Sequence, residues 1–131
     1  MNSTSIPAIG ALWSGQGGIY AGMTRGQDGA PDQHLILAVE EPTESMNFQA
    51  AVDYAKTVTS DGHNDFSVPT KLESALLYAN LQDKVNQDRW YWTSTQYSAH
   101  YAWDQHFVLG NQYVRNKASE LRVRAVRRFI L

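Results

Sequence analysis

Apolar positions along the chain change period twice, and each change predicts a change of structure. In the glycine-rich first part of the chain, short apolar runs occur at Leu12, at Ile19–Met23 and at His34–Glu40. Such runs, bounded by turn residues, predict three β-strands. Asp28-Gly29 lies between the second and third runs, so we expect a hairpin that joins them.

A helical period then replaces the strand pattern. Asn47 is a suitable N-cap, and Asp61-Gly62 a suitable stop, for an amphipathic helix between them. Its apolar positions are Phe48, Ala51, Val52, Ala55 and Val58. Thr70 and Glu73 form a capping box that predicts the start of a second helix. Apolar residues follow at the helical spacing i, i+3, i+4 and i+7: Leu72, Ala75, Leu76 and Ala79.

From Trp90 onward the helical period disappears and β-forming residues dominate. The predicted strands are Trp90–Thr95, Tyr101–Leu109, Gln112–Arg115 and Leu121–Phe129, with a turn at Leu109-Gly110-Asn111. Strands, two helices and further strands in this order predict one α+β domain over residues 1–131, with two helices packed on a twisted antiparallel sheet.

The stretch RWYWTSTQYSAHYAW (89–103) holds six aromatic residues among fifteen. In a strand, Trp90 and Trp92 point to one face and Tyr91 to the other, and we expect the two tryptophans to be structural and to fill the core. The remaining rings and their polar neighbours are either a partner-binding surface, for which this mixture is typical, or further structural residues. The partner-binding candidates are Tyr91, Gln96, Tyr97, Tyr101, Trp103, Asp104, Gln105, Arg115 and Lys117.

Charge is distributed unevenly along the chain. The net charge is −2, but residues 1–111 carry 5 basic and 12 acidic side chains, whereas residues 112–131 carry 6 and 1. The basic segment either contacts an anionic partner or pairs with the acidic majority of its own chain. We favour internal pairing and expect no nucleic-acid partner, because an acidic domain lacks the broad basic surface of a nucleic-acid binder.

Polar and apolar residues alternate over RVRAV (122–126), and Arg127-Arg128 then breaks the alternation, which predicts a bulge or a strand end. We expect an arginine of this segment to form a buried or half-buried ion pair with a helix. Such a pair is structural, because loss of one partner leaves the other charge uncompensated. The candidate residues are Arg124 and Arg127, with Glu73 and Asp53 as acids.

Candidate chemistry is sparse. The absence of cysteine excludes disulfides, thiolate metal sites and cysteine nucleophiles. Asp61, His63 and Asp65 are potential ligands, but we favour a turn after the helix and expect no metal and no cofactor. His100 and His106 fall on one face of a predicted strand without a third ligand. No nucleophile-elbow pattern occurs, so we do not expect an enzyme; an enzyme would depend on one of these two histidines.

No apolar run approaches the length of a membrane span, so we expect no membrane partner. The first residues, MNSTSIPAIG, lack the basic and long apolar regions of a secretory signal. We therefore expect a protein of the cytoplasm.

Three motifs in sequence order, SVPTKLESALLYAN, WYWTST and ELRVRAVRRF, resemble the Lcl C-terminal domain family. The arrangement GQGGIYAG…DQHLILA is similar to compact prophage-type members. The resemblance implies a C-type-lectin-like fold and relatives that bind glycans, glycosaminoglycans or proteins. It does not imply calcium-dependent sugar binding, because the Glu/Gln-Pro-Asn/Asp and Trp-Asn-Asp tripeptides of those lectins are absent and Glu41-Pro42-Thr43 lies before the first helix.

These features favour a phage- or prophage-type binding module that presents residues 95–117 to a macromolecular partner. A protein partner is expected, and a host defence complex is one specific candidate; the module would then be an anti-CRISPR-like counter-defence protein in the host cytoplasm. The alternative is a glycan- or receptor-binding domain associated with the virion. We expect a monomer or dimer in the first case and a trimer in the second.

Overall fold

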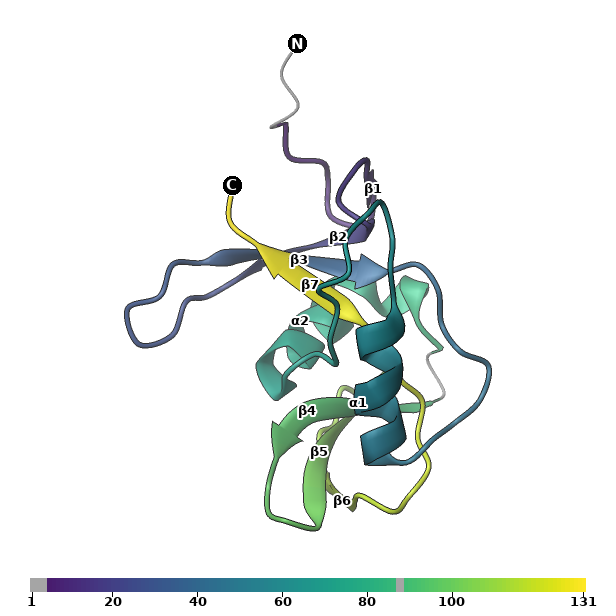
Figure 1. Ribbon diagram of the computed structural model, residues 1–131. Helices are drawn as coiled ribbons and strands as arrows, with labels where there is room; N and C mark the ends of the chain where they lie inside the picture. The colour runs from purple at the N-terminus through teal and green to yellow at the C-terminus, as the bar shows by residue number, and fades with distance from the viewer. Residues whose placement is uncertain (1–4, 87–88) are drawn as a thin grey trace.

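Two helices and two antiparallel sheets make up the fold of the computed structural model, which describes residues 5–86 and 89–131 (Figure 1). The predicted α+β class is confirmed. The elements are β1 (Leu12–Trp13), β2 (Gly18–Thr24), β3 (Gln33–Ala38), α1 (Phe48–Thr57), α2 (Lys71–Leu81), a short 3-10 helix η1 (Gln82–Lys84), β4 (Trp90–Gln96), β5 (Tyr101–His106), β6 (Val114–Asn116) and β7 (Val126–Phe129).

The strands divide between two sheets rather than forming one. The first sheet has the order β1-β2-β3-β7 and the second the order β4-β5-β6. The predicted strand Leu121–Phe129 is shorter than expected, because its first part changes partners. Backbone atoms of Arg122 pair with Trp90 and Trp92, and the Ala125 carbonyl accepts from Ala38. This segment therefore links the second sheet to the first.

In the first half of the chain, the structure has the predicted hairpin turn and the predicted first helix cap. The β2–β3 hairpin is confirmed, and Asp28 and Gly29 take the positive φ values of 53° and 83° that such a turn needs. Asn47 caps α1 as predicted, accepting a hydrogen bond from Ala50 N. The helix ends earlier than predicted, with Val58 as its C-cap. The Asp61-Gly62 pair instead forms a separate turn.

Helix α2 has the predicted start but not the predicted buried face. Thr70 and Glu73 form both hydrogen bonds of the capping box. The buried residues of α2 are Glu73, Ser74, Leu77 and Leu81. At 100° per residue, these lie on the opposite side of the helix from the predicted apolar stripe at 72, 75, 76 and 79. Contacts of α2 with β2, β4 and β5 decide its rotation, so the stripe faces outward.

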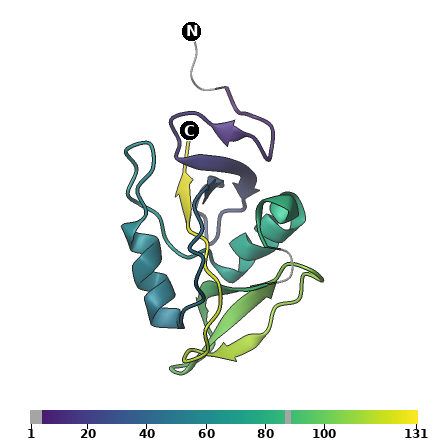
Figure 2. The same ribbon diagram turned by 90° about the vertical axis from the view of Figure 1, so that its right-hand side faces the viewer.

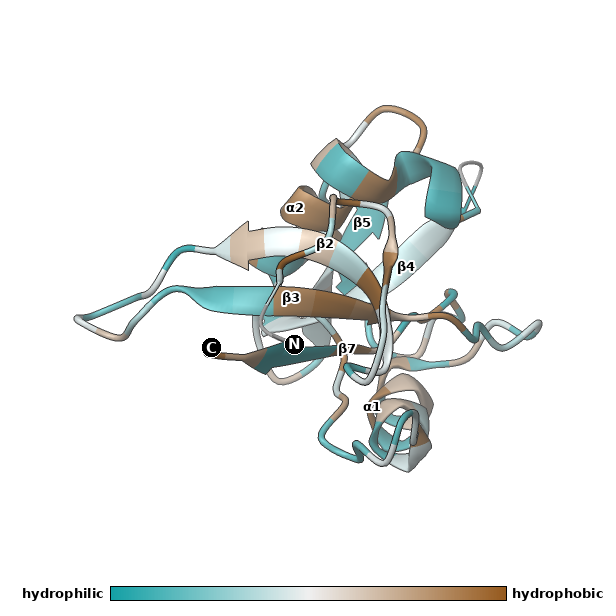
Figure 3. Cartoon of the chain, turned by 90° about the horizontal axis from the view of Figure 1, so that it is seen from above, coloured by the Kyte–Doolittle hydropathy of each residue, from teal (hydrophilic) through white to brown (hydrophobic). Residues whose placement is uncertain are grey.

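Strand β7 runs between the two helices, which lie on opposite sides of the first sheet (Figures 2 and 3). Its register with β3 is continuous through Arg127 and Arg128, so the predicted bulge or strand end is wrong. Successive side chains of a strand point to opposite faces, so each arginine pairs with an acid on a different face of the sheet. Arg127 donates to Asp65 at 2.8 Å, and Arg128 donates to Glu73 at 2.6 and 2.7 Å.

The predicted internal pairing of the basic segment is therefore confirmed, but the predicted partners are not: Glu73 pairs with Arg128 rather than with Arg124 or Arg127. Glu73 is an acid of these pairs, but Asp53 is not: it lies on the exposed side of α1 and accepts from Gln49. Arg124 is buried and donates to Glu41 Oε1, to Lys84 O and to Ala38 O. It ties β3, the loop that follows β3 and η1 together.

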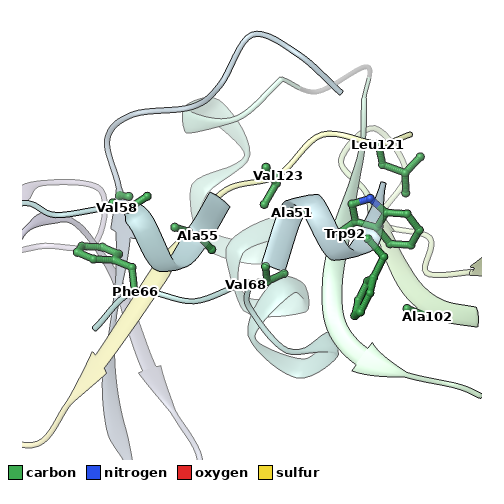
Figure 4. Packing of buried hydrophobic residues seen from close by; sticks show 12 residues of the cluster. Ala51, Ala55, Val58, Phe66, Val68, Trp92, Ala102, Leu121 and Val123 are labelled. Atoms are coloured by element: carbon green, nitrogen blue, oxygen red, sulfur yellow. The ribbon is translucent and has the colours of Figure 1, made fainter. Parts of the chain in front are cut away.

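Trp92 belongs to the larger core cluster and lies toward one end of it, where α1 packs against the second sheet (Figure 4). Its indole is fully buried, stacks edge-on against Phe48 at 5.5 Å and donates to Met46 O at 2.8 Å. The predicted burial of Trp92 in the core is confirmed. Trp90 is half-buried at the margin of the same cluster, because it lies where β4 begins.

Replacing Arg124 with methionine should lower the free energy of unfolding by about 3 kcal/mol or more, because Glu41 and two backbone carbonyls lose a buried donor. Urea unfolding followed by circular dichroism measures the change. Arg25→Met, at an exposed position, is the matched control and should stay within about 0.5 kcal/mol of wild type. Equal effects of the two substitutions would contradict a structural role for Arg124.

Candidate functional site

A groove of about 590 Å³ opens between the start of α1 and the end of β4. Phe48 and Val52 of α1, together with two alanines, supply its apolar part, and the other five lining residues are polar. Its lining residues are Asn47, Phe48, Gln49, Val52, Ser94, Gln96, Ala99, Lys117 and Ala118. The groove thus combines side-chain amides, a hydroxyl and a cation with aromatic surface.

Lys117 is fixed on one wall of this groove. Its ammonium group donates to Gln96 Oε1 at 2.5 Å and to Ala99 O at 3.0 Å, and it lies 5.0 Å from the Phe48 ring centroid. The backbone N–H of Lys117 donates to His100 O, which closes the turn between β4 and β5 against β6. The predicted candidates Gln96 and Lys117 are thus brought together.

An aromatic patch, made of Tyr97, Tyr101, Trp103 and Lys71, lies beyond the same turn. Tyr97 is 65% exposed and Tyr101 42% exposed, whereas Trp103 is half-buried. Tyr97 meets Trp103 edge-on at 6.1 Å, and the Lys71 ammonium lies 3.5 Å from the centroid of a Trp103 ring. Three of the predicted partner-binding residues therefore share one surface. Their contact with a partner stays a prediction.

Hydrogen bonds between threonine side chains and the backbone hold the patch in place. Thr95 Oγ1 accepts from Lys71 N at 2.9 Å, which joins the start of α2 to β4. Thr93 Oγ1 donates to Trp103 O at 2.8 Å, which joins β4 to β5 beneath the indole. Rigid aromatic groups lose little conformational entropy when they bind.

Three of the predicted partner-binding residues are buried instead. Tyr91, Asp104 and Gln105 are 3%, 0% and 1% exposed, which corrects the prediction that they belong to the surface. The physical reason is that both faces of β4 and β5 are covered where these residues lie. Tyr91 packs with Phe107 beside α2, while Asp104 lies under Arg115.

Tyr91 is a structural hydrogen-bonding residue. Its hydroxyl donates to Glu41 Oε2 at 2.7 Å and accepts from Asn86 N at 3.0 Å. Burial, together with the Glu41 carboxylate, raises the pKa of Tyr91 to about 12. The phenol is therefore neutral at physiological pH and serves the fold.

Arg115 faces away from the aromatic patch. Its guanidinium donates to Asp104 Oδ2 at 2.9 Å and lies 4.9 Å from a Trp90 ring centroid, while Trp90 stacks on His106 at 4.1 Å. Burial raises the pKa of the Asp104 carboxyl above its usual range, although hydrogen bonds from Tyr113 N and Arg115 oppose the rise. The predicted candidate Arg115 thus belongs to a separate surface.

The histidines and acids singled out as metal candidates are engaged elsewhere. Asp61 accepts from Gly17 N, the His63 ring contacts Gly15 O, and Asp65 pairs with Arg127. His100 lies before β5 and His106 at its end, roughly 20 Å apart along an extended strand. Within residues 5–86 and 89–131, no group of three or more histidines and acids is placed to hold a metal ion.

The helices of the described chain are also too short or too polar to cross a membrane.

Most of the chain, from the first strand to the last, matches a known family. The family model of the Lcl C-terminal domain matches residues 12–127. The chain belongs to this family. The match extends from β1 into β7, so the groove and the aromatic patch both fall within the Lcl C-terminal domain. No curated protein matches the chain.

Sequence reasoning missed Lys71 and the α1 side of the groove. The sequence signal for Lys71 was the capping box at Thr70, which places Lys71 at the first position of α2. The contact of Lys71 with Trp103 is non-local, because it joins α2 to β5. Asn47 and Phe48 were predicted as cap and core residues, and both also line the groove.

The raised pKa of Asp104 predicts a pH dependence of stability. The folded state keeps a proton on this carboxyl where the unfolded chain, with a pKa of about 3.9, has lost it. The free energy of unfolding should therefore fall as the pH rises from about 4 through the folded-state pKa. Asp104→Asn should lack this decrease.

Urea unfolding at a series of pH values checks this prediction. The difference between wild type and Asp104→Asn should favour wild type increasingly as the pH is lowered toward 4. Asp53→Asn, at an exposed carboxyl, is the matched control. Parallel curves for wild type and Asp104→Asn would mean that burial does not shift this group.

Proposed function

We propose that this Lcl C-terminal domain is a non-enzymatic binding module that recognises a protein partner through the aromatic patch and the adjoining groove. The observation that carries the proposal is the exposure of Tyr97, in the turn after β4, and of Tyr101 beside Trp103 on β5, where the Thr93 and Thr95 hydrogen bonds hold the scaffold. Exposed, pre-ordered aromatic residues are typical of the centres of protein interfaces.

The polar composition of the groove supports binding rather than catalysis. Of its nine described lining residues, Lys117 alone is charged, and its ammonium group is hydrogen-bonded to Gln96 and Ala99. General acid–base catalysis needs a titratable group positioned at a reacting atom. The amides of Asn47, Gln49 and Gln96 are suited instead to hydrogen-bonding a ligand.

The order and packing of the elements agree with a C-type-lectin-like fold, which we propose for the chain. In that arrangement, the turn at residues 97–100 would lie in the binding region. A counter-defence inhibitor of a host complex would use the aromatic patch in this way. A glycan-binding role would use the groove, since amides beside the Phe48 ring suit a saccharide.

Substitution of Tyr97 and Tyr101 by alanine should weaken capture of a partner from host lysate. With the captured protein purified, titration calorimetry should give a Kd raised by about 30-fold or more, as expected for loss of central aromatic contacts. Tyr113→Ala is the matched control, because Tyr113 is also exposed but neighbours Trp90 on the other surface. Circular dichroism checks that each variant folds.

Equal affinity of the double variant and wild type would contradict a role for the aromatic patch. Absence of any captured protein, together with glycan-array binding that Gln96→Ala abolishes, would replace the protein partner with a saccharide in the groove.

A further inference from the structure

The outer side of β6 is an open strand edge next to the aromatic patch. β6 (Val114–Asn116) is the last strand in the order β4-β5-β6, so within the described residues one of its sides has no neighbouring strand. It lies at the bottom of the molecule in Figures 1 and 2. The opposite edge of this sheet is covered, because Trp92 N and Ser94 N of β4 donate to carbonyls of other segments.

The hydrogen bonds at the two ends of the β5–β6 ladder show which backbone groups face outward. Lys117 N donates to His100 O, and Asp104 N donates to Tyr113 O. In an antiparallel pair, residues that bond across the ladder alternate with residues whose N–H and C=O point away from it. Residues 113, 115 and 117 therefore face β5, and residues 114 and 116 face outward.

Three outward backbone groups of β6 are unpaired. They are the N–H and the C=O of Val114 and the N–H of Asn116, for which the described part of the chain offers no hydrogen-bond partner. The Asn116 carbonyl accepts from Ser119 N. Val114 is half-buried and Asn116 is exposed, so this edge is at the surface.

The open edge is continuous with the aromatic patch. Trp103 pairs with Val114 and Tyr101 pairs with Asn116 in the β5–β6 register. Residues that lie directly opposite each other in a sheet project their side chains to the same face. Val114 and Asn116 therefore extend the face that carries Tyr101 and Trp103, up to the edge of the sheet.

We propose that the protein partner docks an extended segment against β6 and adds a strand to the second sheet. Unpaired N–H and C=O groups on an edge strand are a template for such pairing. In this mode of recognition, backbone hydrogen bonds supply affinity, and alternate side chains of the added strand supply specificity. Here the alternate side chains would lie over Val114 and toward Trp103. The inference rests on the proposed function, because it specifies which part of a partner meets the aromatic patch.

Amide hydrogen exchange tests the pairing, with a peptide selected from a random linear library displayed on phage as the probe. In the free domain, the amides of Val114 and Asn116 should exchange rapidly, whereas those of Ala102 and Arg115, inside the ladder, should be protected. The bound peptide should slow exchange at Val114 and Asn116 by about tenfold or more. Nuclear magnetic resonance of the labelled domain measures each amide separately.

Substitution at the edge gives an independent measurement. Val114→Pro removes the outward N–H but no bond of the β5–β6 ladder, and an edge strand tolerates proline where its N–H faces solvent. The peptide Kd should rise by about tenfold or more, because the outer edge can no longer pair. Val114→Ala keeps the N–H, is the matched control, and should stay within about threefold of wild type. Hydrogen exchange of wild type keeps the test valid if Val114→Pro does not fold.

Four results would overturn the inference. They are a library that yields no binding peptide, a peptide that leaves the Val114 and Asn116 amides unprotected, equal affinity of wild type and Val114→Pro, and protection in the free domain that rises with its own concentration. The last result would assign the edge to a second copy of this chain.

The Tyr97 and Tyr101 double alanine variant separates this inference from the proposed function. Peptide binding that is lost in the double variant but kept in Val114→Pro would leave the aromatic patch as the site without strand pairing. Binding that is lost in Val114→Pro but kept in the double variant would support pairing at β6 and contradict the role of the patch.

Discussion

Arginine–acid pairing in the segment 122–128 is the constraint on which the rest of the structure depends. Arg122 and Arg124 share Glu41, while Arg127 and Arg128 reach Asp65 and Glu73 on opposite sides of the first sheet. These contacts connect the loop after β3, the segment after α1 and the start of α2 to the single segment 122–128. A planar guanidinium can make these contacts because it donates hydrogen bonds to carboxylates and backbone carbonyls at the same time.

The pairing also decides which surface is available for binding. Most of the positive charge in the last twenty residues is neutralised internally, so little of it remains for an anionic partner. The cations at the candidate site are the half-buried Lys71 and Lys117, each beside an aromatic ring. Under the proposed function, recognition would therefore depend on aromatic rings and side-chain amides more than on net charge.

Sequence signals predicted the elements whose causes are local. The hairpin at Asp28-Gly29 and the caps at Asn47 and Thr70 depend on neighbouring residues alone. The inward face of α2 could not be predicted, because contacts with distant strands decide its rotation. Asp104 was placed on the surface for the same reason: an alternating strand pattern does not reveal that both faces are covered.

The position of β7 also affects how the chain can reach its folded state. Arg124 and the Ala38 carbonyl that it contacts are separated by 86 residues, and β7 completes a sheet whose other strands lie in the first third of the sequence. Closing so long a loop costs entropy before any native contact compensates for it. Until residues 126–129 dock, β3 has an open edge, so aggregation competes with folding at that stage.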